Sequence, residues 1–66
     1  MSQEDAYQAY DRVRKDFPSF ANFEGCPWIE TKTGWARSNQ SYLLDVTPAR
    51  VRVSGPMLER EWTIDV

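Results

Sequence analysis

The sequence contains no histidine and only one cysteine, Cys26. Histidine is the side chain whose ordinary pKa lies nearest to neutral pH, so the most common general base of enzymes is missing. A single cysteine cannot form an internal disulfide, and no set of cysteines has the spacing of a zinc site. The Glu24 carboxylate near Cys26 disfavours a reactive thiolate, so we expect this cysteine to be structural. The sequence predicts a protein that is not an enzyme.

Phosphate-binding and cation-binding patterns are also missing. Gly25 and Gly34 are isolated, as is Gly55, so no glycine-rich loop is present to hold a phosphate group. Glu59, Glu61 and Asp65 fall on one face of a predicted strand. Residues two apart on a strand are separated by about 6.6 to 6.8 Å, which is too far for both to bind one ion directly. We therefore expect no cofactor and no metal, and interpret these carboxylates as a solvated face.

Long apolar runs are absent as well, and the start of the chain is polar and acidic. A segment that crosses a membrane needs about 20 consecutive apolar residues, and a secretory signal begins with basic residues followed by an apolar stretch. The formal net charge is −2, which has the wrong sign for a general nucleic-acid binder. These features predict a cytoplasmic protein without a membrane segment.

Aromatic residues are plentiful: the 66-residue chain has three tryptophans, three tyrosines and three phenylalanines. A chain of this length forms one domain, residues 1–66, near the lower limit at which a single core is stable. Nearly every large apolar side chain is therefore needed in the core. A single short helix shields only one side of a small sheet, so some apolar side chains stay exposed. We expect the exposed set to come from Trp28, Ile29, Trp35, Leu43 and Met57.

The first part of the chain predicts an amphipathic helix over residues 3–16. Ser2 and Asp5 have the spacing of a capping box at its start. Apolar side chains recur at spacings of four, three and four residues, and Pro18 ends the helix. These apolar residues are Ala6, Tyr10, Val13 and Phe17.

The rest of the chain predicts strands and turns. Residues 41–46 and 50–54 alternate in polarity, with Val51 and Val53 facing inward. Residues 58–66 alternate in the same way, and turns are expected at 47–49 and 55–56. Two interpretations of the region before residue 41 stay open. Either a hairpin turns at Gly34, which then takes a left-handed conformation, or one bulged strand runs to Arg37 and turns at 38–39.

Together these patterns predict an α+β fold, in which one N-terminal amphipathic helix packs on an antiparallel β-meander of three to four strands. We expect Arg37, Arg50 and Arg52 to share the outer sheet face with Trp35. The competing interpretation is that Arg50 and Arg52 simply pair with Glu59 and Glu61 on the next strand. The same alternation places Arg60 on the apolar face, between Leu58 and Trp62. There it stacks on an aromatic ring, lies at the edge and reaches water along its stem, or binds a partner's carboxylate.

These expectations favour a non-catalytic module that binds another protein, as an inhibitor or adaptor that occupies a surface. A homodimer would cover exposed apolar side chains equally well, and the size fits an accessory protein of a virus or mobile element. The alternative is a single-stranded nucleic-acid-binding protein that uses an arginine and aromatic sheet face. The candidate partner-binding residues are Trp28, Trp35, Arg37, Tyr42, Arg50, Arg52 and Arg60.

Overall fold

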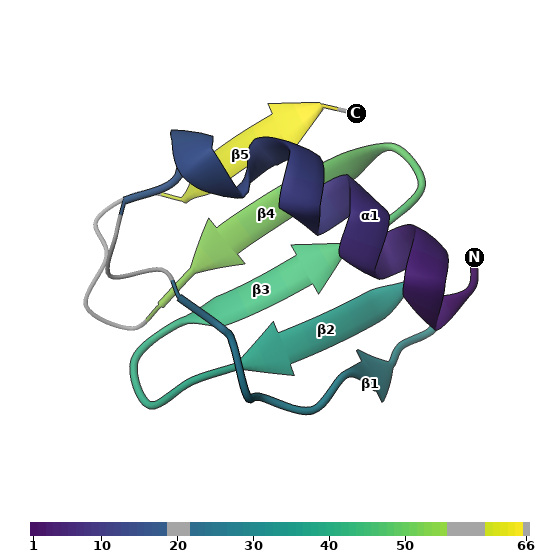
Figure 1. Ribbon diagram of the computed structural model, residues 1–66, viewed down its shortest axis with the longest axis horizontal. Helices are drawn as coiled ribbons and strands as arrows, with labels where there is room; N and C mark the ends of the chain where they lie inside the picture. The colour runs from purple at the N-terminus through teal and green to yellow at the C-terminus, as the bar shows by residue number, and fades with distance from the viewer. Residues whose placement is uncertain (19–21, 56–60, 66) are drawn as a thin grey trace.

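The computed structural model describes residues 1–18, 22–55 and 61–65. One helix, α1 (Gln3–Val13), lies across one face of an antiparallel sheet, and a short 3-10 helix, η1 (Arg14–Asp16), continues it (Figure 1). The sheet has five strands in the order β1-β2-β3-β4-β5, so each strand pairs with its neighbour in sequence. The strands are β1 (Ile29–Glu30), β2 (Trp35–Ser38), β3 (Leu43–Val46), β4 (Arg50–Ser54) and β5 (Trp62–Asp65). The predicted α+β fold is confirmed, with five strands in place of three to four.

The helix begins and ends where the sequence predicts. The Ser2 hydroxyl accepts a hydrogen bond from the Asp5 backbone at 3.1 Å, and the Asp5 carboxylate accepts one from the Ser2 backbone at 3.4 Å. This reciprocal pair satisfies two backbone donors that a helix start otherwise leaves without partners. The backbone becomes extended at Phe17, directly before Pro18. Proline disfavours helical geometry in the residue before it, which accounts for the helix end.

The fifth strand arises because both of the turns that the sequence left open are formed. The Thr31 backbone donates to the Gly34 carbonyl at 2.9 Å and closes the turn between β1 and β2. The Asn39 backbone donates to the Tyr42 carbonyl at 3.0 Å and closes the next turn. The Asn39 side chain also accepts hydrogen bonds from the Ser41 and Tyr42 backbones, a local bond that asparagine favours in turns. The region therefore folds as two short hairpins.

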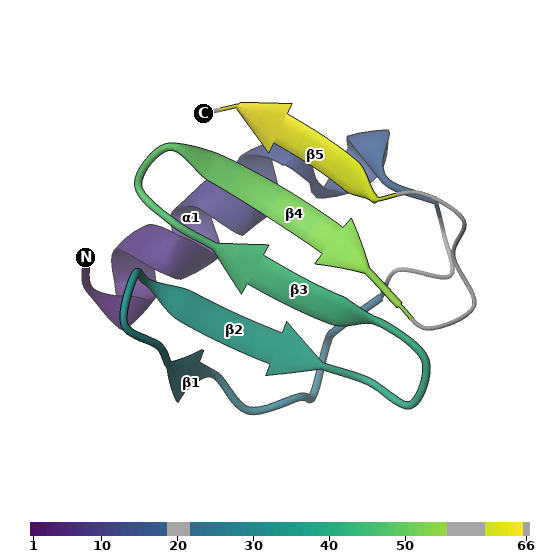
Figure 2. The same ribbon diagram turned by 180° about the vertical axis from the view of Figure 1, so that it is seen from behind.

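The core lies between α1 and the inner face of the sheet. The strand register places Leu44 opposite Val53, and Val46 opposite Val51, and all four side chains are fully buried. Five further residues from the helix and the segment after it complete the core. They are Ala6, Ala9, Tyr10, Phe17 and Phe23. The opposite face of the sheet, which we call the open face, is not covered by a helix (Figure 2).

Glycine is required at position 34 for a reason that the sequence did not reveal. Among the glycines, only Gly25 has a positive φ, at 83°, so the left-handed conformation predicted for Gly34 is wrong. A Cβ atom at Gly34 would instead overlap the backbone carbonyl of Val46. The missing side chain allows the β1–β2 turn to approach the end of β3 closely.

We expect Gly34→Ala to lower the free energy of unfolding by more than about 2 kcal/mol, because the backbone must move to relieve the overlap. Gly25→Ala meets open space and carries only the left-handed penalty, about 1 kcal/mol. Urea denaturation of both variants, followed by circular dichroism, gives the comparison. Equal losses in the two variants would show that close packing at Gly34 is unimportant.

Candidate functional site

The arginine and aromatic surface predicted from the sequence is divided between the two faces of the sheet. Trp35 lies opposite Val46 and Arg37 lies opposite Leu44, so both belong to the inner face. Arg50 and Arg52 alternate with the buried valines of β4 and project from the open face. The prediction that these four residues share one outer face is therefore wrong. Alternation gives the two faces of one strand, but only the register between strands shows which faces coincide.

Arg37 is a buried residue rather than a surface contact. Its side chain is 7% exposed, and its Nε donates a hydrogen bond to the Cys26 carbonyl at 2.9 Å. The guanidinium carbon lies 4.7 Å from the centre of the Trp28 ring, within the range of a cation–π contact. The Nη1 atom is buried and has no hydrogen-bond partner among the residues that the structure describes. Arg37 therefore holds the segment from Cys26 to Trp28 against the sheet.

The predicted aromatic anchors support the core and are only partly accessible. Trp28 and Trp35, like Tyr42, are half-buried and pack against the buried cluster. The Trp28 ring meets the Tyr10 ring edge-on at 6.4 Å, and the Trp35 indole donates a hydrogen bond to the Met1 carbonyl at 3.0 Å. Trp28 and Trp35 are therefore not the exposed members of the set of apolar side chains that the sequence predicted to be incompletely shielded.

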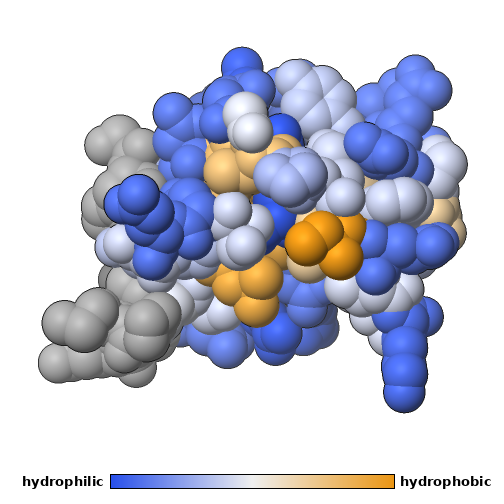
Figure 3. Space-filling view, turned by 90° about the horizontal axis from the view of Figure 1, so that it is seen from below, coloured by the Kyte–Doolittle hydropathy of each residue, from blue (hydrophilic) through white to orange (hydrophobic). Residues whose placement is uncertain are grey.

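Of the five apolar residues that the sequence predicted to be incompletely shielded, two aliphatic ones, Ile29 and Leu43, are exposed. Ile29 is 58% exposed and Leu43 is 43% exposed, whereas Met57 lies outside the described residues. Ile29 lies opposite Ala36, and Leu43 lies opposite Ser38, the next position of β2 on the same face. Ile29, Ala36 and Leu43 thus form a diagonal on the open face across β1, β2 and β3, which we call the apolar corner. Figure 3 views the molecule from the β1 side and shows hydrophobic side chains surrounded by polar ones.

Ion pairs occupy the remainder of the open face. Arg52 contacts Asp45 on β3 at 3.1 Å and Glu61 next to β5 at 3.7 Å, and Arg50 contacts Asp65 at 3.6 Å. The interpretation that these arginines pair with acids of the next strand is confirmed for Arg52, whose partner is Glu61. Arg50 pairs with Asp65, whereas Glu59 and Arg60 lie outside the described residues. Exposed pairs of this kind contribute about 0.2 to 1 kcal/mol each, and they reduce the field available to attract an anion.

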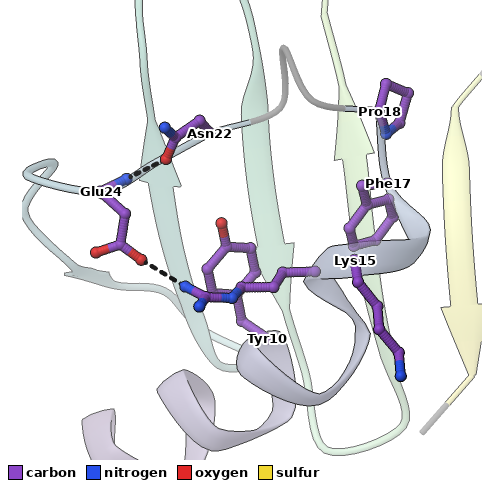
Figure 4. A pocket seen from close by; sticks show the side chains of 7 residues that line it. Tyr10, Lys15, Phe17, Pro18, Asn22 and Glu24 are labelled. Carbon is purple, nitrogen blue, oxygen red and sulfur yellow. Dashed lines mark hydrogen bonds and ion pairs between the residues drawn. The ribbon is translucent and has the colours of Figure 1, made fainter.

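An open pocket of about 570 Å³ lies where the helical segment ends (Figure 4). Arg14 spans it and contacts Glu24 at 3.0 Å and Asp11 at 3.2 Å. None of the described lining residues is a serine, threonine, cysteine or histidine. They are Tyr10, Arg14, Lys15, Phe17, Pro18, Asn22 and Glu24. Residues 19–21, which follow Pro18 in the sequence, lie outside the described residues, and we assign no ligand to this pocket.

Tyr10 lines this pocket, and the pKa of its hydroxyl is shifted by its surroundings. Burial raises the pKa of Tyr10 above its ordinary value, and the nearby Glu24 carboxylate adds to the increase. A hydrogen bond from the Phe23 backbone and the charges of Arg37 and Arg14 act in the opposite direction and are weaker than burial. The neutral phenol is therefore the stable form in the folded protein.

Cofactor and membrane sites are also not indicated by the described part of the chain. Residues 1–18, 22–55 and 61–65 contain no group of three or more cysteine, aspartate or glutamate side chains arranged to hold a metal ion. The same residues include no helix with the length and apolar character needed to span a bilayer. Cys26 is half-buried, and its backbone carbonyl accepts a hydrogen bond from Arg37. The open sheet face is thus the main candidate site.

We expect Arg37→Met to leave the free energy of unfolding within about 1 kcal/mol of wild type, because it removes a buried atom without a partner and keeps most of the packed volume. Arg37→Ala should lower it by about 2 kcal/mol or more, because it leaves a cavity beneath Trp28. Urea denaturation measures both. If the two variants lose the same stability, the cation–π contact and the hydrogen bond to Cys26 matter more than packing.

The raised pKa of Tyr10 predicts a fall in stability at alkaline pH. The unfolded chain loses the Tyr10 proton near pH 10, whereas the folded protein retains it to higher pH. The free energy of unfolding therefore decreases as pH rises above about 10, relative to Tyr10→Phe, which has no proton to lose. Denaturation curves between pH 8 and 11 test this, with Tyr7→Phe as a control for loss of an exposed hydroxyl. Parallel curves for wild type and Tyr10→Phe would contradict it.

Comparison with known proteins assigns no family. No protein-family model matches the chain, and neither the search of curated proteins nor the search of solved structures gave a match. The function must be inferred from the residues of the open face and from the edges of the sheet.

Proposed function

We propose that the protein is a non-catalytic protein-binding module that acts as an inhibitor or adaptor by covering part of its partner's surface. The observation that supports this most directly is the apolar corner on the open face of the sheet. Ile29 and Leu43 have the largest exposed fractions among the large hydrophobic side chains of the described residues. Both lie on the face without a helix.

The apolar corner has the composition of an interface centre. Burying a side chain such as isoleucine or leucine contributes about 1.5 to 3 kcal/mol, so two of them supply a useful part of a binding free energy. Charged groups surround the corner: Asp45 and Arg52 continue the Ile29–Ala36 row across the sheet. An apolar centre with a polar and charged rim is the usual arrangement in protein interfaces.

In this proposal, the candidate partner-binding residues have different roles from those expected from the sequence. Trp28 and Trp35 support the corner from the opposite side of the sheet, and Tyr42 also packs against the core. Arg50 and Arg52 form the rim and supply directional contacts to a partner. In this proposal, Arg37 shapes the β1 side of the sheet by holding Trp28, the residue before Ile29.

The composition of the open face favours a different protein over a second copy of this chain. Among the described residues, its ion-paired side chains are two arginines, Arg50 and Arg52, and three acids, Asp45, Glu61 and Asp65. Two copies placed face to face would bring equal net negative charges together and would bury several ion pairs. Burial of ion pairs costs more desolvation energy than well-placed apolar contacts do. No observation favours the nucleic-acid alternative, because Trp35 lies on the face opposite to Arg50 and Arg52.

We expect Ile29→Ser combined with Leu43→Ser to reduce recovery of the protein's partner more than tenfold, because the apolar centre of the interface is lost. The measurement is affinity capture from native cell extract with the full chain as bait, followed by mass spectrometry. Tyr7→Ser is the matched control, since it removes a 39% exposed hydrophobic side chain from the helix. Circular dichroism confirms that each variant is folded. Equal recovery with the double variant and with wild type would refute the open face as the binding surface.

A further inference from the structure

We propose that the outer edge of β5 binds an extended, basic segment of a partner protein as a sixth strand of the sheet. This surface is separate from the apolar corner and lies at the opposite end of the sheet. The inference does not depend on the proposed function of the corner. It rests on three features: the backbone at the edge, the β5 side chains on the helix side of the sheet (the inner row) and the β5 side chains on the open face (the outer row).

The edge offers backbone groups for pairing. Among the described strands, β5 (Trp62–Asp65) pairs only with β4, and its other side faces away from the sheet (Figures 1 and 2). An edge strand presents a row of N–H and C=O groups that an extended peptide can pair with. The opposite edge, β1, has only two residues, and such short edge strands are poor templates. The β5 edge is therefore the better of the two for strand addition.

The inner row of side chains continues beyond the part of the sheet that the helix covers. Val51 and Val53 on β4 are fully buried, whereas their neighbours on β5, Ile64 and Trp62, are only half-buried. Both β5 side chains pack against the core. An added strand with apolar side chains on the helix side would cover the exposed parts of this row. Among the described residues, the fully buried row thus ends at β4, and Ile64 on β5 keeps part of its surface exposed.

The outer row determines the charge of the added strand. Glu61 and Asp65 flank Thr63, and their side chains are 51% and 80% exposed. Their contacts to arginines of β4, at 3.7 and 3.6 Å, are longer than the 3.1 Å contact of Arg52 with Asp45. A lysine or arginine on an added strand would lie beside these carboxylates, and opposite charges on adjacent strands attract. The complementary segment therefore alternates apolar and basic residues.

The same carboxylates disfavour a second copy of this chain as the occupant. An antiparallel pairing of two β5 strands in full register places Glu61 of one copy opposite Asp65 of the other, and the reverse. Like charges directly opposite each other destabilise a strand pair. Charge at an edge is a common means by which proteins avoid pairing with their own copies. The edge is therefore selective for a strand of opposite charge.

The test is a nuclear magnetic resonance titration of the full-length protein with two synthetic seven-residue peptides, one alternating lysine and valine and the other glutamate and valine. We expect saturable shifts of the backbone amide signals of residues 62–65 with the lysine peptide, at an affinity at least tenfold higher than for the glutamate peptide. Glu61→Lys combined with Asp65→Lys should reverse this preference. The neutral variant, Glu61→Gln with Asp65→Asn, should abolish it and is the alternative if the reversed variant does not fold.

Two controls make the result specific. Glu4→Lys with Glu30→Lys changes the net charge by the same amount at exposed positions in the first turn of α1 and on β1, the opposite edge of the sheet, and it should keep the preference for the lysine peptide. The Ile29→Ser, Leu43→Ser variant should bind the peptide as wild type does, which separates this proposal from that of the apolar corner. Shifts spread over the whole surface, equal binding of both peptides or an absence of saturable binding would overturn the proposal. Concentration-dependent shifts of residues 62–65 without peptide would identify a second copy as the occupant and would also overturn it.

Discussion

The burial of one row of branched side chains beneath a single helix is the constraint on which the whole structure depends. Leu44 and Val46 on β3, with Val51 and Val53 on β4, are fully buried against α1. The chain has no disulfide, and its described residues hold no metal cluster, so packing supplies the stability of this part. Because the helix can cover only the middle of one face, the other face and both edges of the sheet are left for other uses.

This constraint explains the different fates of the arginines. On the open face, Arg50 and Arg52 lie beside acidic residues of neighbouring strands, where water and ion pairs satisfy them. Arg37 lies on the inner face, where its guanidinium contacts the Trp28 ring and donates a hydrogen bond to the Cys26 carbonyl. A buried guanidinium with an unsatisfied nitrogen reduces stability unless its other contacts compensate. Here those contacts connect the segment before β1 to the sheet, so Arg37 has a structural role.

The two candidate surfaces differ in the physics that would drive binding. The apolar corner offers side chains on a face, where affinity comes mainly from removal of hydrophobic surface from water. The β5 edge offers backbone hydrogen bonds, with side-chain rows that select polarity and charge. They lie at opposite ends of the sheet, so one partner could occupy each. An adaptor needs two such surfaces, whereas an inhibitor needs only one.

The sequence by itself determined the capped helix, the strands from residue 41 onward and their alternation, because these depend on local hydrogen bonds and on the period of apolar residues. It named Ile29 and Leu43 only within a set of five residues that could not all be shielded, and it did not separate them from Trp28 and Trp35. It did not determine which residues of different strands share a face, and so it misplaced Trp35 and Arg37. Register between strands is decided by which pairing buries the most apolar surface under the helix, and that sum involves the whole molecule. Only the tertiary structure could therefore separate the buried Arg37 from the exposed Arg50 and show where the sheet remains open.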